Sequence, residues 1–154
     1  MKVSGESHGI ETLARGVCIL GNQVLLCRNR RHGNVYLPGG HIEFGESGAE
    51  ALAREIDEEM GCAARVGRFL GCVEHGFDQH GEPHAEINLV YRMRVAGLSI
   101  RRTPPCREAW IEFFWQPLDA LRGARLEPAV LCRFLPGWLA SPGNLATTKR
   151  KHQS

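Results

Sequence analysis

Long hydrophobic runs are absent from this sequence of 154 residues. The longest apolar stretches, such as residues 24–27, fall far short of the ~20 residues that a helix needs to cross a bilayer. Residues 1–11 are polar and lack the apolar core of a secretion signal. We therefore expect a soluble, cytoplasmic protein with no membrane contact.

A strong charge of one sign and closely paired cysteines are also absent. The formal net charge is +2, and three positive charges lie at residues 149–151, so the rest of the chain is close to neutral. Such a chain does not have the charge expected of a general nucleic-acid binder. The six cysteines form no C-x-x-C pair, which argues against a zinc knuckle or a redox dithiol. Several lie in apolar runs, so we expect buried free thiols rather than disulfides.

The composition is that of a globular protein, with 43% hydrophobic and 23% charged residues. The length suits one domain. No internal repeat or long linker divides the chain. We expect a single domain over residues 1–140 and a disordered basic tail over residues 141–154.

Apolar patterning predicts several strands and two helices. Alternation is clearest over residues 86–95, where apolar side chains recur at every second position. The second helix is expected over residues 128–135, with Pro128 in its first turn. Mixed strands and helices point to an α+β or α/β/α sandwich fold. The other expected strands cover residues 16–20, 23–28, 35–37, 66–77 and 110–115, with turns at residues 78–83.

The first helix has clear start and stop signals. Ser47 stands three residues before Glu50, the spacing of a capping box in which each side chain satisfies an amide of the first turn. Gly61 is expected to end the helix in the left-handed conformation. Apolar residues at helical spacing form one stripe between these ends: Ala49, Leu52, Ala53, Ile56 and Met60.

Three carboxylates gather on one side of that helix. Glu55, Glu58 and Glu59 fall within an arc of roughly 100° at the edge of the apolar stripe. They repel one another, and a hard cation such as Mg²⁺ would remove that penalty. The alternative interpretation is an ordinary solvated acidic face. The context favours a site, because a Gly-Gly turn can add a backbone ligand and Glu46 can pair with Arg54.

The spacing of these residues resembles the signature of the Nudix hydrolase family. Cys62 is the one departure, since an aliphatic residue is usual there, and we expect a small apolar cysteine to fill the position. Residues 37–40 before this segment and residues 114–121 near the end of the chain also resemble the family. The matching positions are Gly40, Glu46, Arg54, Glu55, Ile56, Glu58, Glu59 and Gly61.

The resemblance implies a Nudix α/β/α sandwich with a mixed sheet, in which this segment forms a loop–helix–loop. It also implies hydrolysis of a nucleoside diphosphate linked to another group, dependent on Mg²⁺ or Mn²⁺. Catalysis by metal-activated water would then rely on positioning and electrostatics. By the same resemblance, the metal would be bound by Glu55, Glu58, Glu59 and the Gly40 carbonyl. Glu55 would alternatively orient the attacking water. The structure of the segment would be supported by Gly40, Glu46, Arg54 and Gly61.

Residues outside the segment are assigned less directly. Glu108 is the first candidate for the general base and Glu86 the second, against the alternative of ordinary surface glutamates. Arg28 and Arg30 are candidate phosphate contacts, because the arginine fork matches phosphate oxygens, with a solvated loop as the alternative. His75, His80 and His84 with Asp78 form a polar loop, a loop that contacts substrate, or a metal site.

The sequence leaves the substrate open between a nucleoside triphosphate and a nucleotide sugar such as ADP-ribose. A Nudix-fold nucleotide sensor without turnover is the alternative function, and the intact set of Glu55, Glu58 and Glu59 favours the enzyme. The expected partner is a small nucleoside diphosphate derivative rather than a nucleic acid. The oligomeric state is not readable from the sequence, and a homodimer would be unremarkable.

Overall fold

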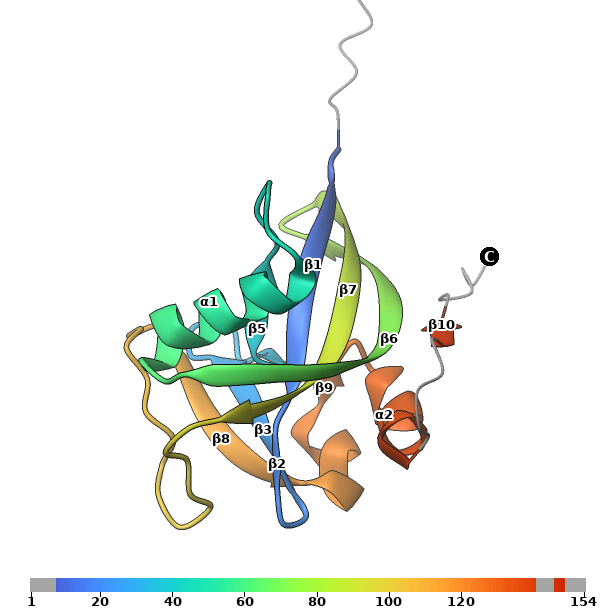
Figure 1. The fold of residues 1–154 in the computed structure, drawn as a ribbon. Helices are drawn as coiled ribbons and strands as arrows, with labels where there is room; N and C mark the ends of the chain where they lie inside the picture. The colour runs from blue at the N-terminus through green and yellow to red at the C-terminus, as the bar shows by residue number, and fades with distance from the viewer. Residues whose placement is uncertain (1–7, 141–145, 149–154) are drawn as a thin grey trace, which may run out of the picture.

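The computed structural model describes residues 8–140 and 146–148. Strands dominate, with α1 (Gly48–Met60), α2 (Leu131–Ala140) and the 3-10 helix η1 (Leu118–Ala124) between them (Figure 1). No helix in these ranges is long and apolar enough to span a membrane. The strands are β1 (Ile10–Val17), β2 (Ile19–Leu20), β3 (Gln23–Asn29), β4 (Val35–Tyr36), β5 (Gly39–His41), β6 (Ala64–Gln79), β7 (Glu82–Val95), β8 (Ile111–Pro117), β9 (Leu126–Glu127) and β10 (Ala146–Thr148).

The strands form two mixed sheets. One has the order β10-β6-β7-β1-β5, in which β1 runs parallel to β7 and antiparallel to β5. The other has the order β2-β3-β4-β9, with β8 paired to β3. Mixed sheets with few helices confirm the predicted α+β fold.

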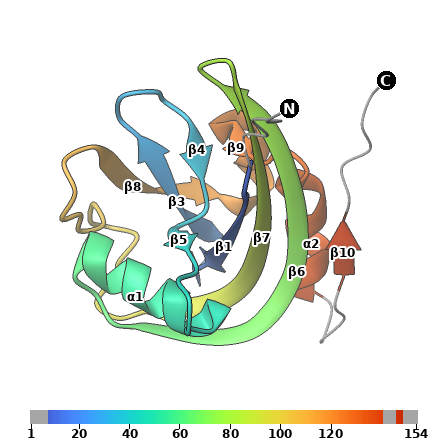
Figure 2. The same cartoon turned by 90° about the horizontal axis from the view of Figure 1, so that it is seen from above.

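Two apolar cores hold the layers together. The α1 core joins Leu52 and Ile56 of α1 to residues of β1, β3, β7 and β8: Ala14, Leu25, Met93 and Phe113. The α2 core joins α2 and η1 to the sheets through residues such as Leu135, Trp138 and Leu70. Figure 2 shows α1 and α2 on opposite sides of the molecule, with strands between them. This is the predicted sandwich.

The start and stop signals of α1 are confirmed. The Ser47 hydroxyl accepts a hydrogen bond from the Glu50 amide at 3.2 Å, and the Ser47 amide donates to Glu50 Oε2 at 2.7 Å. Gly61 adopts a left-handed φ of 69° and its amide donates to the Asp57 carbonyl at 2.8 Å. Both ends of the helix are therefore fixed by local hydrogen bonds.

Several element boundaries differ from those predicted. Strand β1 begins at Ile10 rather than at residue 16. The whole strand, including its more polar first half, pairs with β7. Gly39 and Gly40 do not end a strand but form β5, which pairs with Ala14 and Arg15 of β1. The turn of the β6–β7 hairpin is confined to residues 80–81 rather than the predicted 78–83, because pairing between the two strands continues to Gln79 and Glu82. Pairing partners distant in sequence decide the boundaries of β1 and β5, whereas the β6–β7 turn is set by pairing between neighbouring residues.

Helix α2 is also shifted from its predicted position. It begins at Leu131, after Pro128, and continues past Pro136 to Ala140. Proline inside a helix removes a hydrogen bond, but burial of Leu135 and Trp138 in the α2 core offsets that loss.

The cysteine prediction is confirmed in its main point, because all six thiols are free. Cys18 and Cys27 are buried, whereas Cys106 is exposed. Cys62 is half-buried and packs against the α1 core, as expected for an apolar position. Of the predicted tail, β10 pairs with β6, while residues 141–145 and 149–154 lie outside the described residues.

Candidate functional site

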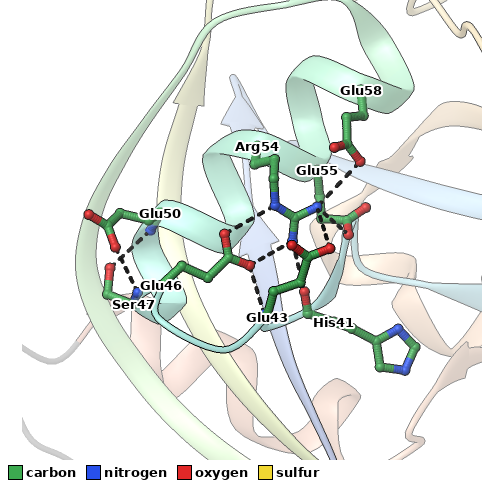
Figure 3. Close-up of polar contacts among 8 residues, drawn as sticks. All are labelled: His41, Glu43, Glu46, Ser47, Glu50, Arg54, Glu55 and Glu58. Carbon is green, nitrogen blue, oxygen red and sulfur yellow. Dashed lines mark hydrogen bonds and ion pairs between the residues drawn. The ribbon is translucent and has the colours of Figure 1, made fainter.

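Arg54 is the centre of a polar network on α1 (Figure 3). Its guanidinium donates to both oxygens of Glu46, at 3.1 and 2.7 Å, and to the His41 carbonyl at 3.0 Å. The hydrogen bonds to Glu46 raise the pKa of Arg54 and lower the pKa of Glu46. Glu46 also accepts from the Glu43 amide at 2.8 Å. This two-pronged ion pair ties the loop that precedes α1 to the helix itself.

The same guanidinium reaches two of the predicted metal ligands. Nη1 of Arg54 donates to Glu55 Oε1 at 3.0 Å and to Glu58 Oε2 at 3.3 Å. Glu55 is well covered, with 17% of its side chain exposed, whereas Glu58 is 55% exposed. Arg54 therefore offsets the repulsion expected between these carboxylates.

The Glu55 carboxylate also lies against the Gly-Gly turn. A Cβ atom at Gly40 would stand only 2.4 Å from Glu55 Cδ, so any side chain there would displace the carboxylate. Glycine at this position thus allows a carboxylate of α1 to approach the backbone of β5. The predicted ligands Gly40 and Glu55 are brought together.

Glu59 has the most perturbed ionisation of the carboxylates on α1. Burial raises its pKa to about 8, and the neighbouring charge of Glu55 adds to the rise, while Arg15 acts in the opposite direction. Glu108 and Glu58 contribute smaller effects of the same sign as Glu55. A carboxylate shifted this far by burial and by like charges is typical of a functional site.

The two candidate bases lie in different places. Glu108 is close enough to Glu59 to affect its pKa, and its Oε2 accepts a hydrogen bond from Trp110 Nε1 at 3.2 Å. Glu86 lies instead on β7, where its Oε2 accepts from Asn88 Nδ2 at 3.2 Å. Only Glu108 is therefore associated with the carboxylate cluster.

A closed metal site is not preformed. Among residues 8–140 and 146–148, no three side chains of Asp, Glu, His or Cys converge closely enough to hold an ion. Glu55 and Glu58 are directed to Arg54 instead. The donors available are nonetheless all oxygen atoms, the kind that Mg²⁺ prefers, on one half-buried stretch of helix.

A cavity of about 680 Å³ includes Arg15 of β1 in its wall, and none of its described lining residues belongs to α1. Its walls come from β1, the turn after β3, β4, the outer β6–β7 hairpin, and the segment that leads into α2. Glu74, Asp78, Glu86 and Glu127 supply carboxylates, while Arg15 supplies the one arginine or lysine among the described lining residues. Its volume is within the range of small-molecule sites. Of the histidine-rich turn, His75 and Asp78 line the cavity, and His80 and His84 do not.

Arg28 and Arg30 do not line this cavity. Arg28 forms an ion pair with Glu112 at 2.8 Å and lies over the Phe114 ring at 4.2 Å. Arg30 donates to the Ile111 carbonyl at 3.1 Å and lies 3.8 Å from Glu112. Both side chains are thus held by β8 and its neighbours.

Sequence reasoning missed Arg15 and Asn88, which line the cavity together. Arg15 Nε donates to Asn88 Oδ1 at 3.3 Å, and Arg15 Nη1 donates to the Leu37 carbonyl at 3.2 Å. The available signal was a single arginine inside an otherwise apolar run at residues 13–20. The segment at residues 127–131 was also missed as a cavity wall, because only the tertiary fold brings it there.

Comparison with known proteins adds an independent result. The model of the NUDIX domain matches residues 11–134. The chain is 34% identical over 102 residues to a Methanocaldococcus jannaschii protein named ADP-ribose pyrophosphatase; this covers 64% of the chain and 58% of that protein. A Bacillus subtilis relative is 37% identical over 70 residues, 46% of the chain and 32% of the relative. The chain thus spans less than two thirds of either relative.

Solved structures agree on the fold. A Nudix hydrolase from Nitrosomonas europaea superposes with a TM-score of 0.65 at 18% identity, covering 86% of this chain and 90% of its own. An ADP-ribose pyrophosphatase from Streptococcus suis gives a TM-score of 0.56 at 19% identity, covering 91% and 98%. At these identities the likeness concerns the fold alone.

Proposed function

This chain belongs to the NUDIX domain family, and from that premise we propose that it is a pyrophosphohydrolase acting on a nucleoside diphosphate linked to another group. ADP-ribose or another nucleotide sugar is the substrate we place first, and a nucleoside triphosphate is the other class. The relative named ADP-ribose pyrophosphatase, which matches 64% of the chain, supports this order.

The observation that carries the proposal is the arrangement of α1. Arg54 gathers Glu55 and Glu58 beside half-buried Glu59, whose pKa is raised to about 8. Such crowding is costly for a merely structural helix face. It is useful where a cation and a phosphate must be bound together.

Mg²⁺ or Mn²⁺ is the proposed cofactor. The residues fit an oxygen-liganded cation, with Glu55, Glu58, Glu59 and the backbone at Gly40 as its holders, once Glu55 and Glu58 turn from Arg54. When bound, the ion would neutralise phosphate charge and make a bound water more acidic. Burial and the charge of Glu55 raise the pKa of Glu59, and a bound cation would act against both effects.

The protein's own residues would supply positioning and proton transfer. Arg54 would keep the α1 carboxylates and the preceding loop in one fixed relation. Glu108, close to Glu59, would take the proton of the attacking water on Oε1, since its Oε2 accepts from Trp110. Trp110 thereby orients the proposed base.

The cavity would hold the part of the substrate that is not the diphosphate. Four carboxylates on its walls repel additional phosphate groups and accept hydrogen bonds from hydroxyl or amino groups. A ribose, another sugar or a nucleobase carries such donors. This favours nucleotide sugars over substrates with a further phosphate on that side.

The test is a release assay with ADP-ribose, other nucleotide sugars, NADH, dinucleoside polyphosphates and nucleoside triphosphates. Each would be run with Mg²⁺, with Mn²⁺ and with chelator, beside Glu58→Gln. Metal-dependent release that is lost in the variant is the expected result. No release, with nucleotide binding that survives in the variant, would establish the sensor function instead.

The cytoplasmic location, the homodimer, the domain limit at residue 140 and the lack of nucleic-acid binding remain predictions.

A further inference from the structure

Arg15 lies in the wall of the cavity without a carboxylate partner. It is half-buried on β1, between Gly39 of β5 and Val90 of β7 in the strand register. Within the described ranges, no carboxylate oxygen lies within 4.0 Å of its guanidinium, although such pairs form at Arg28 and Arg54. The charge therefore faces the cavity unpaired.

Its direct partners are neutral. Asn88 Oδ1 and the Leu37 carbonyl accept its two hydrogen bonds, and the guanidinium carbon lies 5.0 Å from the centre of the Tyr36 ring. Nη2 has no hydrogen-bond partner among residues 8–140 and 146–148. A guanidinium that is held in place but lacks an anion is preorganised to bind one.

The guanidinium is fixed rather than free to turn away. Asn88 is only 2% exposed, and its carboxamide donates to Glu86 while accepting from Arg15. The Leu37 carbonyl restrains the other arm. Asn88 is thus a positioning residue that sets the direction in which Arg15 presents its remaining N–H groups.

Arg15 also connects the cavity with β5, because it pairs with Gly39 in the strand register, next to Gly40, against which the Glu55 carboxylate lies. It is close enough to Glu86 in the cavity and to Glu59 on α1 for each charge to affect its pKa, which burial lowers. A molecule that spans from the α1 carboxylates into the cavity would therefore pass this guanidinium. Arg28 and Arg30, held by Glu112, do not compete for that position.

We propose that Arg15 binds a phosphate oxygen of the substrate and holds the diphosphate between the carboxylates of α1 and the cavity. The inference rests on the proposed function, because it assumes that a diphosphate bridges these two places. It adds a specificity determinant, because a ligand would have to present a phosphate to the part of the cavity wall that Arg15 forms.

The variants are Arg15→Gln, which removes the charge, and Arg15→Lys, which keeps the charge without the planar fork. Arg94→Gln is the matched control, because Arg94 lies exposed on β7 and does not line the cavity. Two measurements are made on each variant. The first is kcat and KM for ADP-ribose with Mg²⁺. The second is the rise in Tm caused by inorganic pyrophosphate or, separately, by adenosine, both in the presence of chelator.

For Arg15→Gln we expect KM to rise about 10-fold or more, with a smaller change in kcat, since one charged hydrogen-bonding group is lost. The Tm shift with pyrophosphate should disappear, whereas any shift with adenosine should remain. Arg15→Lys should fall between the wild type and Arg15→Gln. A merely structural role would lower Tm without separating pyrophosphate from adenosine.

An unchanged KM and an unchanged pyrophosphate shift in Arg15→Gln, as in Arg94→Gln, would overturn the proposal. If Arg15→Gln does not fold, the test rests on Arg15→Lys. A wild-type KM and a wild-type Tm shift with pyrophosphate in Arg15→Lys would then overturn the proposal. If the wild type hydrolyses no nucleotide, the proposed function fails. The pyrophosphate measurement still decides the role of Arg15 in that case.

Discussion

The two α-helices of this protein are held in place in different ways. Both ends of α1 are closed by local hydrogen bonds, from the Ser47–Glu50 capping box to Gly61, and Arg54 ties it to the preceding loop. Helix α2 contains Pro136 and is held by burial of Leu131, Leu135 and Trp138. Both helices bury apolar side chains, but α1 adds a capping box and an ion pair that ties it to its loop. The polar side-chain contact described for α2 is Arg68 Nη2, which donates to the Trp138 and Leu139 carbonyls at its C-terminal end.

The difference matches what each helix carries. Hydrogen bonds fix orientation, which a helix needs when its exposed side must present carboxylates at set positions. Apolar burial is less directional and is sufficient for a helix that only covers a core. Changes to the carboxylates of α1 should therefore affect mainly activity, changes in the α2 core should affect mainly stability, and changes to the polar contacts that fix α1 should affect stability by smaller amounts.

The largest effect is expected for Glu58→Gln on α1. Removing one ligand charge should lower kcat at least about 100-fold, the scale found when one electrostatic group is removed from an active site. The melting temperature should change little, because the Glu58 side chain is 55% exposed. Steady-state kinetics and thermal melting check this.

Asp57→Asn is the control for that prediction, because Asp57 is an exposed carboxylate on the same helix but outside the cluster. It should retain wild-type kcat. Equal losses of kcat in both variants would mean that the net negative charge of the helix, and not the cluster of Glu55, Glu58 and Glu59, supports turnover.

The second effect is on stability alone. Trp138→Ala should lower the free energy of unfolding by about 3–5 kcal/mol, since Trp138 is 6% exposed and fills the α2 core. Denaturant unfolding measures it, with exposed Arg133→Ala on the same helix as control. The kcat of the folded enzyme should stay unchanged, and a parallel loss of kcat would show that the two sides of the molecule are coupled.

A smaller effect is expected from the capping box. Ser47→Ala removes the acceptor for the Glu50 amide and should cost about 1 kcal/mol of stability. Thr103→Ala, at an exposed loop residue, should cost nothing measurable. If both variants unfold at the same denaturant concentration, the cap does not contribute to holding α1.

The smallest effect depends on pH. Arg54 lowers the pKa of Glu46 below its ordinary value of 4.5, so the pair stabilises the folded state above that pH. The stabilisation is lost as the pH falls through the lowered pKa. The difference in Tm between wild type and Glu46→Gln should therefore be present at pH 6–7 and shrink in acid. A difference that is constant with pH would show that the pair does not act through its charges.

Local signals predicted α1 from the sequence. Its cap, its stop at Gly61 and most of its apolar stripe depend on residues within one turn of each other, and the structure confirms them. The predicted stripe differs from the buried side of the helix, because Ala49 and Ala53 are only half-buried whereas Ala51, which was not in the stripe, is buried. The family and fold followed from the same segment.

Features that depend on distant residues were not predictable in this way. The first half of β1 forms because β7 lies beside it, and β5 forms because β1 does. The cavity joins residues from five separate parts of the chain, so Glu127 carried no local sign of its place and Arg15 only that of an arginine in an apolar run. The arginines at positions 28 and 30 were noticeable in sequence, but Glu112, more than 80 residues away, determines where they lie.

The long β6–β7 hairpin has a consequence for how such a protein can diversify. Its outer part, at residues 74–79 and 82–88, forms a wall of the cavity but contributes no member to either apolar core among the described residues. Replacements there should alter what the cavity accepts at little cost to folding, except at Asn88, which is buried and hydrogen-bonded to Arg15 and Glu86. Selection could therefore change ligand preference in this stretch while α1, which carries the proposed metal ligands, stays unchanged.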